Sequence, residues 1–260
     1  MSEVAVTRPT RPAELDANAV LKQAWALYRR LFGRSVLLGA LVLGALHFLQ
    51  ALATFGRTGV LVSLLALVLG VAGIALLQGG LVEVVRGLHS DGSADASLGD
   101  VLARAGSRLW RLLAVSLLTG LGVGFGLLLL VVPGLVLMTR WALAVPVAML
   151  EPGTARDALS RSREIVRGNG RNVFKVLFAV GVLTALVQVP FGLAAAGSGA
   201  FGWWLAVTTA SALTAPYAAH ALTVVYYELV EPGRPVVLEP GTRWQSIWDE
   251  QDAGPTDDAG

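Results

Sequence analysis

The sequence predicts an all-α, polytopic membrane protein in which six transmembrane helices form three repeats. The first observation is composition. The 260 residues have a mean hydropathy of +0.65 and only 15% are charged, whereas about a quarter are charged in a soluble domain. The second is a set of six apolar segments of membrane-spanning length, and the third is a basic amphipathic segment before each pair of them. Each repeat is therefore predicted to be one cytoplasmic amphipathic helix followed by two spans.

The six spans follow from length and pattern. A bilayer core needs about 20 consecutive apolar residues of helix. The strands of a membrane barrel would alternate polar and apolar residues, and these segments do not alternate. We expect transmembrane helices at about 35–55, 59–83, 110–132, 134–150, 172–196 and 203–228.

Small residues and prolines predict local features of the spans. Four glycines in the third span recur one helical turn apart, which is typical of a face that packs closely against another helix. They are Gly120, Gly122, Gly124 and Gly126. Pro133 and Gly134 are expected to form a tight hairpin between the third and fourth spans. Pro146, inside the fourth span, removes a backbone hydrogen bond and predicts a kink.

Each repeat begins with an amphipathic segment that is basic on its polar side. The first covers about residues 16–32. The second begins with Ser97 and Asp100, and the third with Thr154 and Asp157. Both pairs fit the capping box, in which the hydroxyl accepts from a free amide and the acid reaches back to the cap residue. A basic amphipathic helix beside a span usually lies in the headgroup layer.

The basic side chains of these segments are predicted to contact anionic lipid headgroups of the inner leaflet, where each contributes about 1 kcal/mol. They are Arg29, Arg30, Arg104, Arg108, Arg111, Arg163, Arg167 and Arg171. Membrane anchoring explains this charge, and docking of another membrane or cytoplasmic protein is the alternative. Nucleic-acid binding is not expected, because the charge is spread along the helices without a binding motif.

The distribution of Lys and Arg orients the protein, since cytoplasmic loops carry the excess. If the spans are correct, 18 of the 20 Lys and Arg residues lie on one side, Arg57 alone lies on the other, and Arg140 lies within the fourth span. We expect a multi-pass protein of the cell inner membrane with both termini in the cytoplasm. A membrane domain at 13–231 is predicted between a disordered N-terminus at 1–12 and a disordered acidic tail at 232–260.

The stretch 133–175 carries a more specific pattern. A Pro-Gly pair is followed by Arg-Trp in the next apolar segment, then Pro and Glu, and then an Ala-Leu-x-Arg-Ser segment with later Val, Gly, Arg and Phe. These residues are Pro133, Gly134, Arg140, Trp141, Pro146, Glu151, Ala158, Leu159, Arg161, Ser162, Val166, Gly168, Arg171 and Phe174.

This pattern resembles the membrane domain attached to some bacterial glycerophosphoryl diester phosphodiesterases and the related YciC-like inner-membrane proteins. The resemblance covers about residues 16–231. Members often end the last span with Tyr-Asp-Leu-Arg, whereas this chain has Tyr-Glu-Leu-Val at 227–230. The phosphodiesterase activity of such fusions belongs to a separate soluble barrel, which needs about 250 residues. The resemblance therefore implies a stand-alone membrane part without that activity.

Arg140 is the strongest single-residue signal, because ionisable groups inside a span are costly and usually face the bundle interior. Three interpretations remain: an inward structural arginine that binds backbone carbonyls or a glutamate, a site for an anion such as a lipid phosphate, and a side chain that extends outward to the interface. Trp141 follows it directly. Other polar residues within spans are expected to make hydrogen bonds between helices. They are His47, Gln78, Gln188 and His220.

The remaining acidic and metal-ligand candidates are few. Glu83, Glu151 and Glu228 fall near the inner ends of spans and are predicted to be interfacial. The chain has no Cys and three His, none of them in a His-x-x-x-His pair. We therefore predict no metal site, no cofactor and no catalytic residue.

The predicted function is a non-enzymatic inner-membrane protein. It would be a scaffold or accessory subunit in membrane, envelope or lipid homeostasis. The alternative is a transporter or flippase for an anionic lipid or solute, with Arg140 in its binding site.

Overall fold

The computed structural model describes residues 15–56, 59–91 and 97–231. The predicted disordered N-terminus and the predicted acidic tail both lie outside these residues. Within them the chain is all-helical, with no strand. The helices are α1 (Ala17–Phe55), α2 (Val60–Asp91), α3 (Leu98–Ser107), α4 (Leu109–Leu129), α5 (Val131–Arg140), α6 (Ala144–Leu150), α7 (Ala155–Val166), α8 (Gly170–Ala195) and α9 (Gly199–Val230).

Five segments of the described chain are long and apolar enough to cross a membrane. They are Ala17–Phe55, Val60–Ser90, Leu109–Leu129, Val131–Leu150 and Gly170–Ala195. Large apolar side chains on these helices stay exposed: Leu61 and Leu128 are 83% and 80% exposed. Soluble monomers rarely expose continuous apolar surface, whereas hydrocarbon solvates it. The protein is therefore suited to a membrane rather than to water.

The sixth predicted span, at about 203–228, falls in α9, which is not among those five segments. α9 packs most extensively against α1 and α8, and many of its buried residues are small or polar, including Thr208, Thr214 and Thr223. A helix enclosed by its neighbours needs less apolar surface than a helix that faces lipid, which explains its lower hydropathy. Six crossings therefore remain a prediction.

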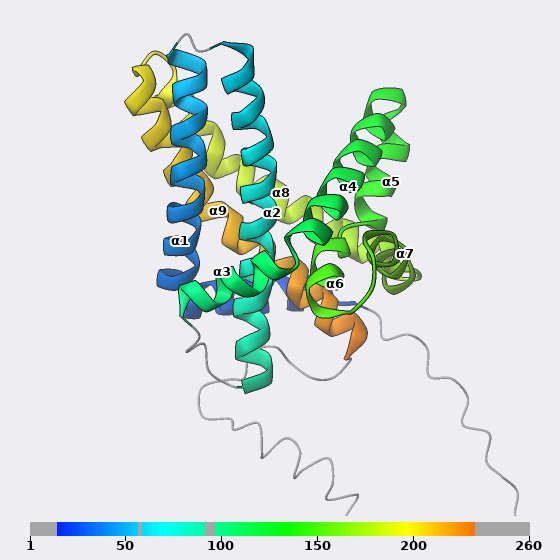
Figure 1. The fold of residues 1–260 in the computed structure, drawn as a ribbon. Coiled ribbons are helices and arrows are strands. Elements are labelled where there is room, and N and C mark those ends of the chain that lie inside the picture. The colour runs from blue at the N-terminus through cyan, green and yellow to red at the C-terminus, as the bar shows by residue number, and fades with distance from the viewer. Residues whose placement is uncertain (1–14, 57–58, 92–96, 232–260) are drawn as a thin grey trace, which may run out of the picture.

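The separate surface helix expected at 16–32 is continuous with the span that follows it. Asp16 caps α1 by accepting from the Asn18 amide, and the helix then runs unbroken to Phe55. No proline interrupts this region, and proline is the usual cause of a helix break. The helix is nevertheless bent. In Figure 1 its first part, in dark blue, lies across the lower end of the molecule and the rest rises beside α2.

α3 and α7 are the other two amphipathic segments, and both lie at the lower end of the molecule (Figure 1). The predicted capping box is confirmed at Thr154 and Asp157. At the other pair Ser97 accepts from the Asp100 amide as predicted, but the Asp100 carboxylate accepts from the Ser97 hydroxyl rather than from the cap amide. α3 is shorter than expected, because the helix ends at Ser107 and α4 begins at Leu109.

The prediction that Pro133 and Gly134 form the turn between α4 and α5 is wrong. The chain turns at Leu130, so Pro133 lies in the first turn of α5 rather than between the helices. Proline fits there because the first amides of a helix have no intrahelical partner. Gly126 packs against Gly134: a Cβ on Gly126 would lie 2.9 Å from the Gly134 Cα.

Only half of the predicted glycine face is used. Gly126 faces α5 and Gly122 faces the ring of Trp141. Gly120 and Gly124 meet no other atom within 4 Å of a Cβ position, so the prediction of close packing is wrong for them. The two pairs lie on different faces of α4, and α5 covers only one of those faces.

The fourth span is a broken helix. α5 ends at Arg140 and α6 begins at Ala144, with a turn between them. Pro146 explains the break, since it has no amide to donate and its ring clashes with the carbonyl four residues earlier. The buried Ser162 of α7 holds the turn. Its hydroxyl donates to the Arg140 carbonyl at 2.9 Å and accepts from the Leu143 amide at 3.1 Å.

Candidate functional site

An arginine-lined groove lies where α5, α7 and the start of α8 meet, and has a volume of about 580 Å³. Its basic side is formed by four arginines from the three helices and the α7–α8 turn. They are Arg140, Arg163, Arg167 and Arg171. Its apolar side is formed by Val132, Leu135, Val136, Val166 and Phe174. No acidic residue is among the described residues that line it.

The four arginines are free to bind a ligand. None of their guanidinium groups makes a hydrogen bond or an ion pair with another described residue, and all four residues are exposed. The interpretation in which Arg140 faces inward and binds carbonyls or a glutamate therefore has no contact to support it. Four unpaired guanidinium groups without a neighbouring carboxylate make a strongly positive groove, and such grooves concentrate anions.

Local sequence places these arginines. Arg163 and Arg167 are four residues apart at the end of α7, so they lie on one face. The turn into α8 needs a residue with positive φ, and Gly168 supplies it at φ 92°. Arg171, at the start of α8, then lies beside the end of α7. Arg140 joins them because Ser162 fixes its backbone carbonyl to α7.

A second cavity lies on the other side of α5 and has a volume of about 610 Å³. It is formed by residues of α1, α2, α4, α5, α6, α8 and α9 and by the α5–α6 turn. Four of the residues predicted to be polar positions inside spans line it together: His47, Gln78, Trp141 and Gln188. We call it the central cavity. α5 thus separates Arg140, in the arginine groove, from Trp141, in the central cavity.

The polar residues in the spans make some of the predicted hydrogen bonds between helices. The His47 Nδ1 lies 3.3 Å from the Thr208 hydroxyl, and Gln188 donates to the Thr214 hydroxyl at 3.2 Å. His220 is fully buried, and its Nε2 lies 3.0 Å from the Ser35 hydroxyl. His220 is therefore part of the α1–α9 contact and lines neither cavity.

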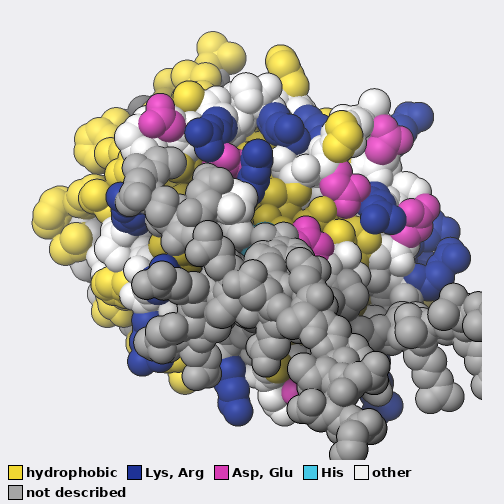
Figure 2. Space-filling view, turned by 90° about the horizontal axis from the view of Figure 1, so that it is seen from below, with side chains coloured by type: hydrophobic (Ala, Val, Ile, Leu, Met, Phe, Trp, Pro, Cys, Tyr) yellow, Lys and Arg dark blue, Asp and Glu magenta, His cyan; other side chains and the backbone are white. Residues whose placement is uncertain are grey.

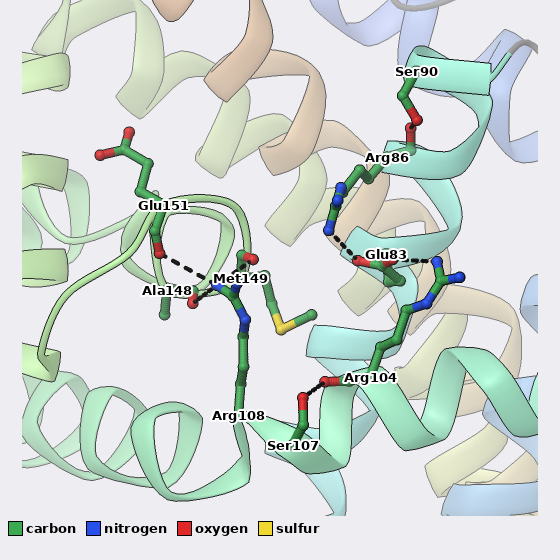
Figure 3. Close-up of polar contacts among 9 residues, drawn as sticks. All are labelled: Glu83, Arg86, Ser90, Arg104, Ser107, Arg108, Ala148, Met149 and Glu151. Atoms are coloured by element: carbon green, nitrogen blue, oxygen red, sulfur yellow. Dashed lines mark hydrogen bonds and ion pairs between the residues drawn. The ribbon is translucent and has the colours of Figure 1, made fainter.

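Three of the arginines predicted to contact lipid, Arg104, Arg108 and Arg111, have partners within the protein, and Figure 3 shows Arg104 and Arg108. Arg104 binds the buried Glu83 at 2.9 Å, and Arg86 binds the same carboxylate at 3.3 Å. Glu83 is therefore a buried, paired acid rather than an open interfacial one. These pairs neutralise a carboxylate that would be costly to bury alone.

Arg108 and Arg111 bind the end of α6. Arg108 donates to the carbonyl of Met149 at 2.8 Å, and Arg111 donates to the carbonyl of Ala148 at 3.0 Å (Figure 3 shows the Arg108 contacts). The last carbonyls of a helix lack intrahelical donors and carry partial negative charge, so a cation stabilises them. Headgroup contact by these two arginines and by Arg104 stays a prediction.

The other predicted interfacial acids also have protein partners. Glu151 forms an ion pair with Arg161 at 3.3 Å and accepts from the Tyr226 hydroxyl at 3.0 Å. Glu228 accepts from the Gln23 amide at 2.6 Å. Both acids therefore tie the lower ends of helices together. Arg29 and Arg30 of α1 are exposed.

The lower face of the molecule is charged. Figure 2, a view from below, shows Lys and Arg side chains spread around this face, with Asp and Glu among them. This is the end at which α3, α7 and the first part of α1 lie (Figure 1). Within the described part of the chain, no group of three His, Asp or Glu residues is placed to hold a metal ion.

Comparison with family models, curated proteins and solved structures finds no match to this chain. The resemblance to the membrane domain of the phosphodiesterase and YciC-like proteins therefore stays a prediction.

Sequence reasoning missed two features of the groove. Ser162 entered only as a residue of the resemblance, although its hydroxyl joins α7 to the broken fourth span. The second is the meeting of Arg140 with the end of α7, more than 20 residues away in the sequence. Periodicity describes single helices, so it gives no signal for a contact of this kind.

Proposed function

We propose that this chain is a multi-pass inner-membrane protein that binds an anionic phospholipid in the arginine groove. The observation that carries the proposal is a set of four arginines that have no partner among the described residues and that face an apolar wall. A guanidinium group matches phosphate through paired N–H donors. The apolar wall matches an acyl chain. A phospholipid presents both features in this order, whereas a free anion would leave the apolar wall without a partner.

The position of the groove also supports a lipid. Arg140 belongs to a helical segment that is long enough to cross a membrane, while Arg163 belongs to α7 and Arg167 follows its last residue, at the charged lower end. A phospholipid with its headgroup at the interface and its acyl chain along α5 would therefore have its normal orientation in the bilayer. Binding is the step that both an accessory protein in lipid homeostasis and a lipid transporter would use. The proposal involves no catalysis.

The orientation belongs to the same proposal. Both termini would lie in the cytoplasm, with α9 as the sixth crossing and each repeat made of one amphipathic segment and two spans. Support comes from the 18 Lys and Arg residues predicted to lie on one side and from the charged lower face. The 32 residues of α9 would extend about 48 Å, which exceeds the roughly 30 Å of hydrocarbon.

The test is a titration of the purified protein in nanodiscs of phosphatidylcholine with increasing phosphatidylglycerol, read by native mass spectrometry. The variant Arg140→Gln/Arg167→Gln removes two groove charges, and Arg34→Gln/Arg156→Gln, at two exposed arginines outside the groove, is the matched control. At about 1 kcal/mol for each charge, the groove variant should bind phosphatidylglycerol roughly thirtyfold more weakly.

The control should bind phosphatidylglycerol as the wild type does. Inorganic phosphate is the second ligand. The proposal expects it to bind far more weakly than the lipid. Equal affinity of the two double variants for phosphatidylglycerol would contradict the proposal, and so would tight binding of phosphate alone.

A further inference from the structure

The central cavity has a different chemistry from the arginine groove. No Asp, Glu, Lys or Arg is among the described residues that line it. Its polar groups are instead amides, hydroxyls and one imidazole. They belong to His47, Gln78, Ser116, Thr119, Gln188 and Ser211. Most of the remaining wall is apolar. Its volume of about 610 Å³ lies within the range of small-molecule sites, roughly 300–1,000 Å³.

Several of these polar groups have no partner in the protein. The side chains of Gln78, Ser116 and Ser211 make no hydrogen bond with another described residue. The Thr119 hydroxyl is buried and also unpaired within the described chain. His47 and Gln188 use one atom each on α9 and keep a second polar atom. Unpaired polar groups at membrane depth cost free energy, so a ligand that pairs with them would stabilise the protein.

The donors and acceptors define the ligand class. Amides and hydroxyls both donate and accept hydrogen bonds, as the hydroxyl groups of a sugar or glycerol do. An ion would lose its hydration without meeting a countercharge in this cavity. Trp141 adds a flat apolar surface with one polar edge, which suits the alternating polar and apolar faces of a polyol.

We propose that the central cavity binds an uncharged, hydroxyl-rich group such as a sugar or glycerol. This site goes beyond the lipid-phosphate groove. It lies on the opposite side of α5, and none of the four groove arginines lines it. The polyol enters either as the headgroup of a membrane lipid or as a free solute, and the experiment separates these two sources.

The experiment uses the full-length protein in phosphatidylcholine nanodiscs that contain either monoglucosyl diacylglycerol or plain diacylglycerol. Native mass spectrometry measures the retention of each lipid, and calorimetry measures the binding of free glucose. Wild type should retain the glucosyl lipid at least tenfold more strongly than diacylglycerol, or should bind free glucose. Retention of neither polyol above background would overturn the proposal.

Variants locate the binding. Gln78→Leu removes an exposed, unpaired amide, so the protein should fold normally while polyol binding falls about tenfold, the equivalent of one lost hydrogen bond. Ser116→Ala is the second cavity variant and should also weaken binding. Gln50→Leu makes the same change at an exposed position of α1 outside the cavity and should leave binding unchanged. Arg140→Gln should leave it unchanged too.

Two results would overturn the assignment. One is equal binding by Gln78→Leu, Ser116→Ala and wild type. The other is loss of polyol binding in Arg140→Gln, which would place the polyol in the arginine groove instead.

Discussion

For Arg140, the sequence predicts that the position is special but does not predict which way the side chain points. An arginine inside an apolar segment signals a special position, because such charges are costly in lipid. Its direction could not be predicted, since the helix that carries it ends at Arg140 itself and helical periodicity stops there. The structure turns Arg140 toward three other arginines and Trp141 toward the opposite cavity. Neighbouring residues in sequence therefore serve two different sites.

Ser162 does not line the groove, but removing its hydroxyl should disturb the groove because it holds the α5–α6 turn next to Arg140. Its hydroxyl pairs with both sides of the α5–α6 turn. Ser162→Ala leaves a buried amide unpaired, at a cost of about 1–3 kcal/mol. We expect a lower melting temperature in detergent and weaker phosphatidylglycerol binding. Ser160→Ala, two residues earlier and exposed, is the control. Equal melting temperatures for the two variants would mean that the turn does not depend on this hydroxyl.

At the scale of elements, long helices and their caps were predictable, whereas breaks and packing partners were not. Apolar length predicted the five segments that are long and apolar enough to cross a membrane, and the N-caps Ser97 and Thr154 were predicted correctly because their contacts are local. The continuity of α1 was not foreseen, since polarity changes along it while backbone geometry does not. The break after Arg140 depends on Pro146 together with Ser162, and the second of these is a long-range contact.

The α4–α5 hairpin gives a matched test of packing. Gly126→Ala places a methyl group against the Gly134 backbone, and such overpacking typically costs about 1–3 kcal/mol. Gly124→Ala adds the same methyl group where no atom lies within 4 Å. It should be neutral, or stabilising by up to about 1 kcal/mol through helix propensity. Thermal unfolding in detergent measures both. Equal destabilisation by the two variants would contradict the observed helix contact.

The capping box of α7 should respond to pH. Hydrogen bonds from the Thr154 amide and hydroxyl lower the pKa of Asp157 from its ordinary value of 3.8, with Arg111 acting in the same direction. A lowered pKa in the folded state means that the stabilisation is complete above the ordinary value and is lost as the pH falls through the lowered one. Amide exchange at the start of α7, measured relative to the intrinsic rate at each pH, should therefore accelerate only in acid.

The Asp157→Asn variant provides the control for this effect. It has no titratable group at the cap, so amide exchange at the start of α7 should lose this acid-dependent acceleration. Thr154→Ala removes the cap itself, at a cost of about 1 kcal/mol, and should raise exchange at every pH. An acid transition that persists unchanged in Asp157→Asn would assign it to another group.

For the whole molecule, composition together with the length and pattern of the apolar segments predicted an all-helical membrane protein. The number of membrane crossings is harder to predict, because α9 lies among other helices and its small or polar buried residues lower its hydropathy. The two cavities could not be predicted at all. The arginine groove forms where α5 packs against α7 and α8, and the central cavity is built from helices that are far apart in the chain, from α1 to α9.

The proposed orientation can be tested directly, because the chain contains no cysteine. A single Cys at Gly59 or Ser198 should react from outside intact cells with a membrane-impermeant maleimide. A single Cys at Ser160 should react only after the membrane is opened. The charge asymmetry of the loops is the physical reason for this expectation. Labelling of Ser160→Cys in intact cells would reverse the orientation, and opposite accessibility of Gly59 and Ser198 would change the number of crossings.

The most direct test of the lipid-binding proposal is the phospholipid that the protein carries from its own membrane. The wild type, Arg140→Gln/Arg167→Gln and the control Arg34→Gln/Arg156→Gln would be purified in mild detergent, and bound phospholipid would be quantified by class. We predict that anionic phospholipid is enriched over its share of the membrane in the wild type and the control, and that this enrichment is lost in the groove variant. Bound lipid that matches the membrane composition in all three proteins would contradict the proposal.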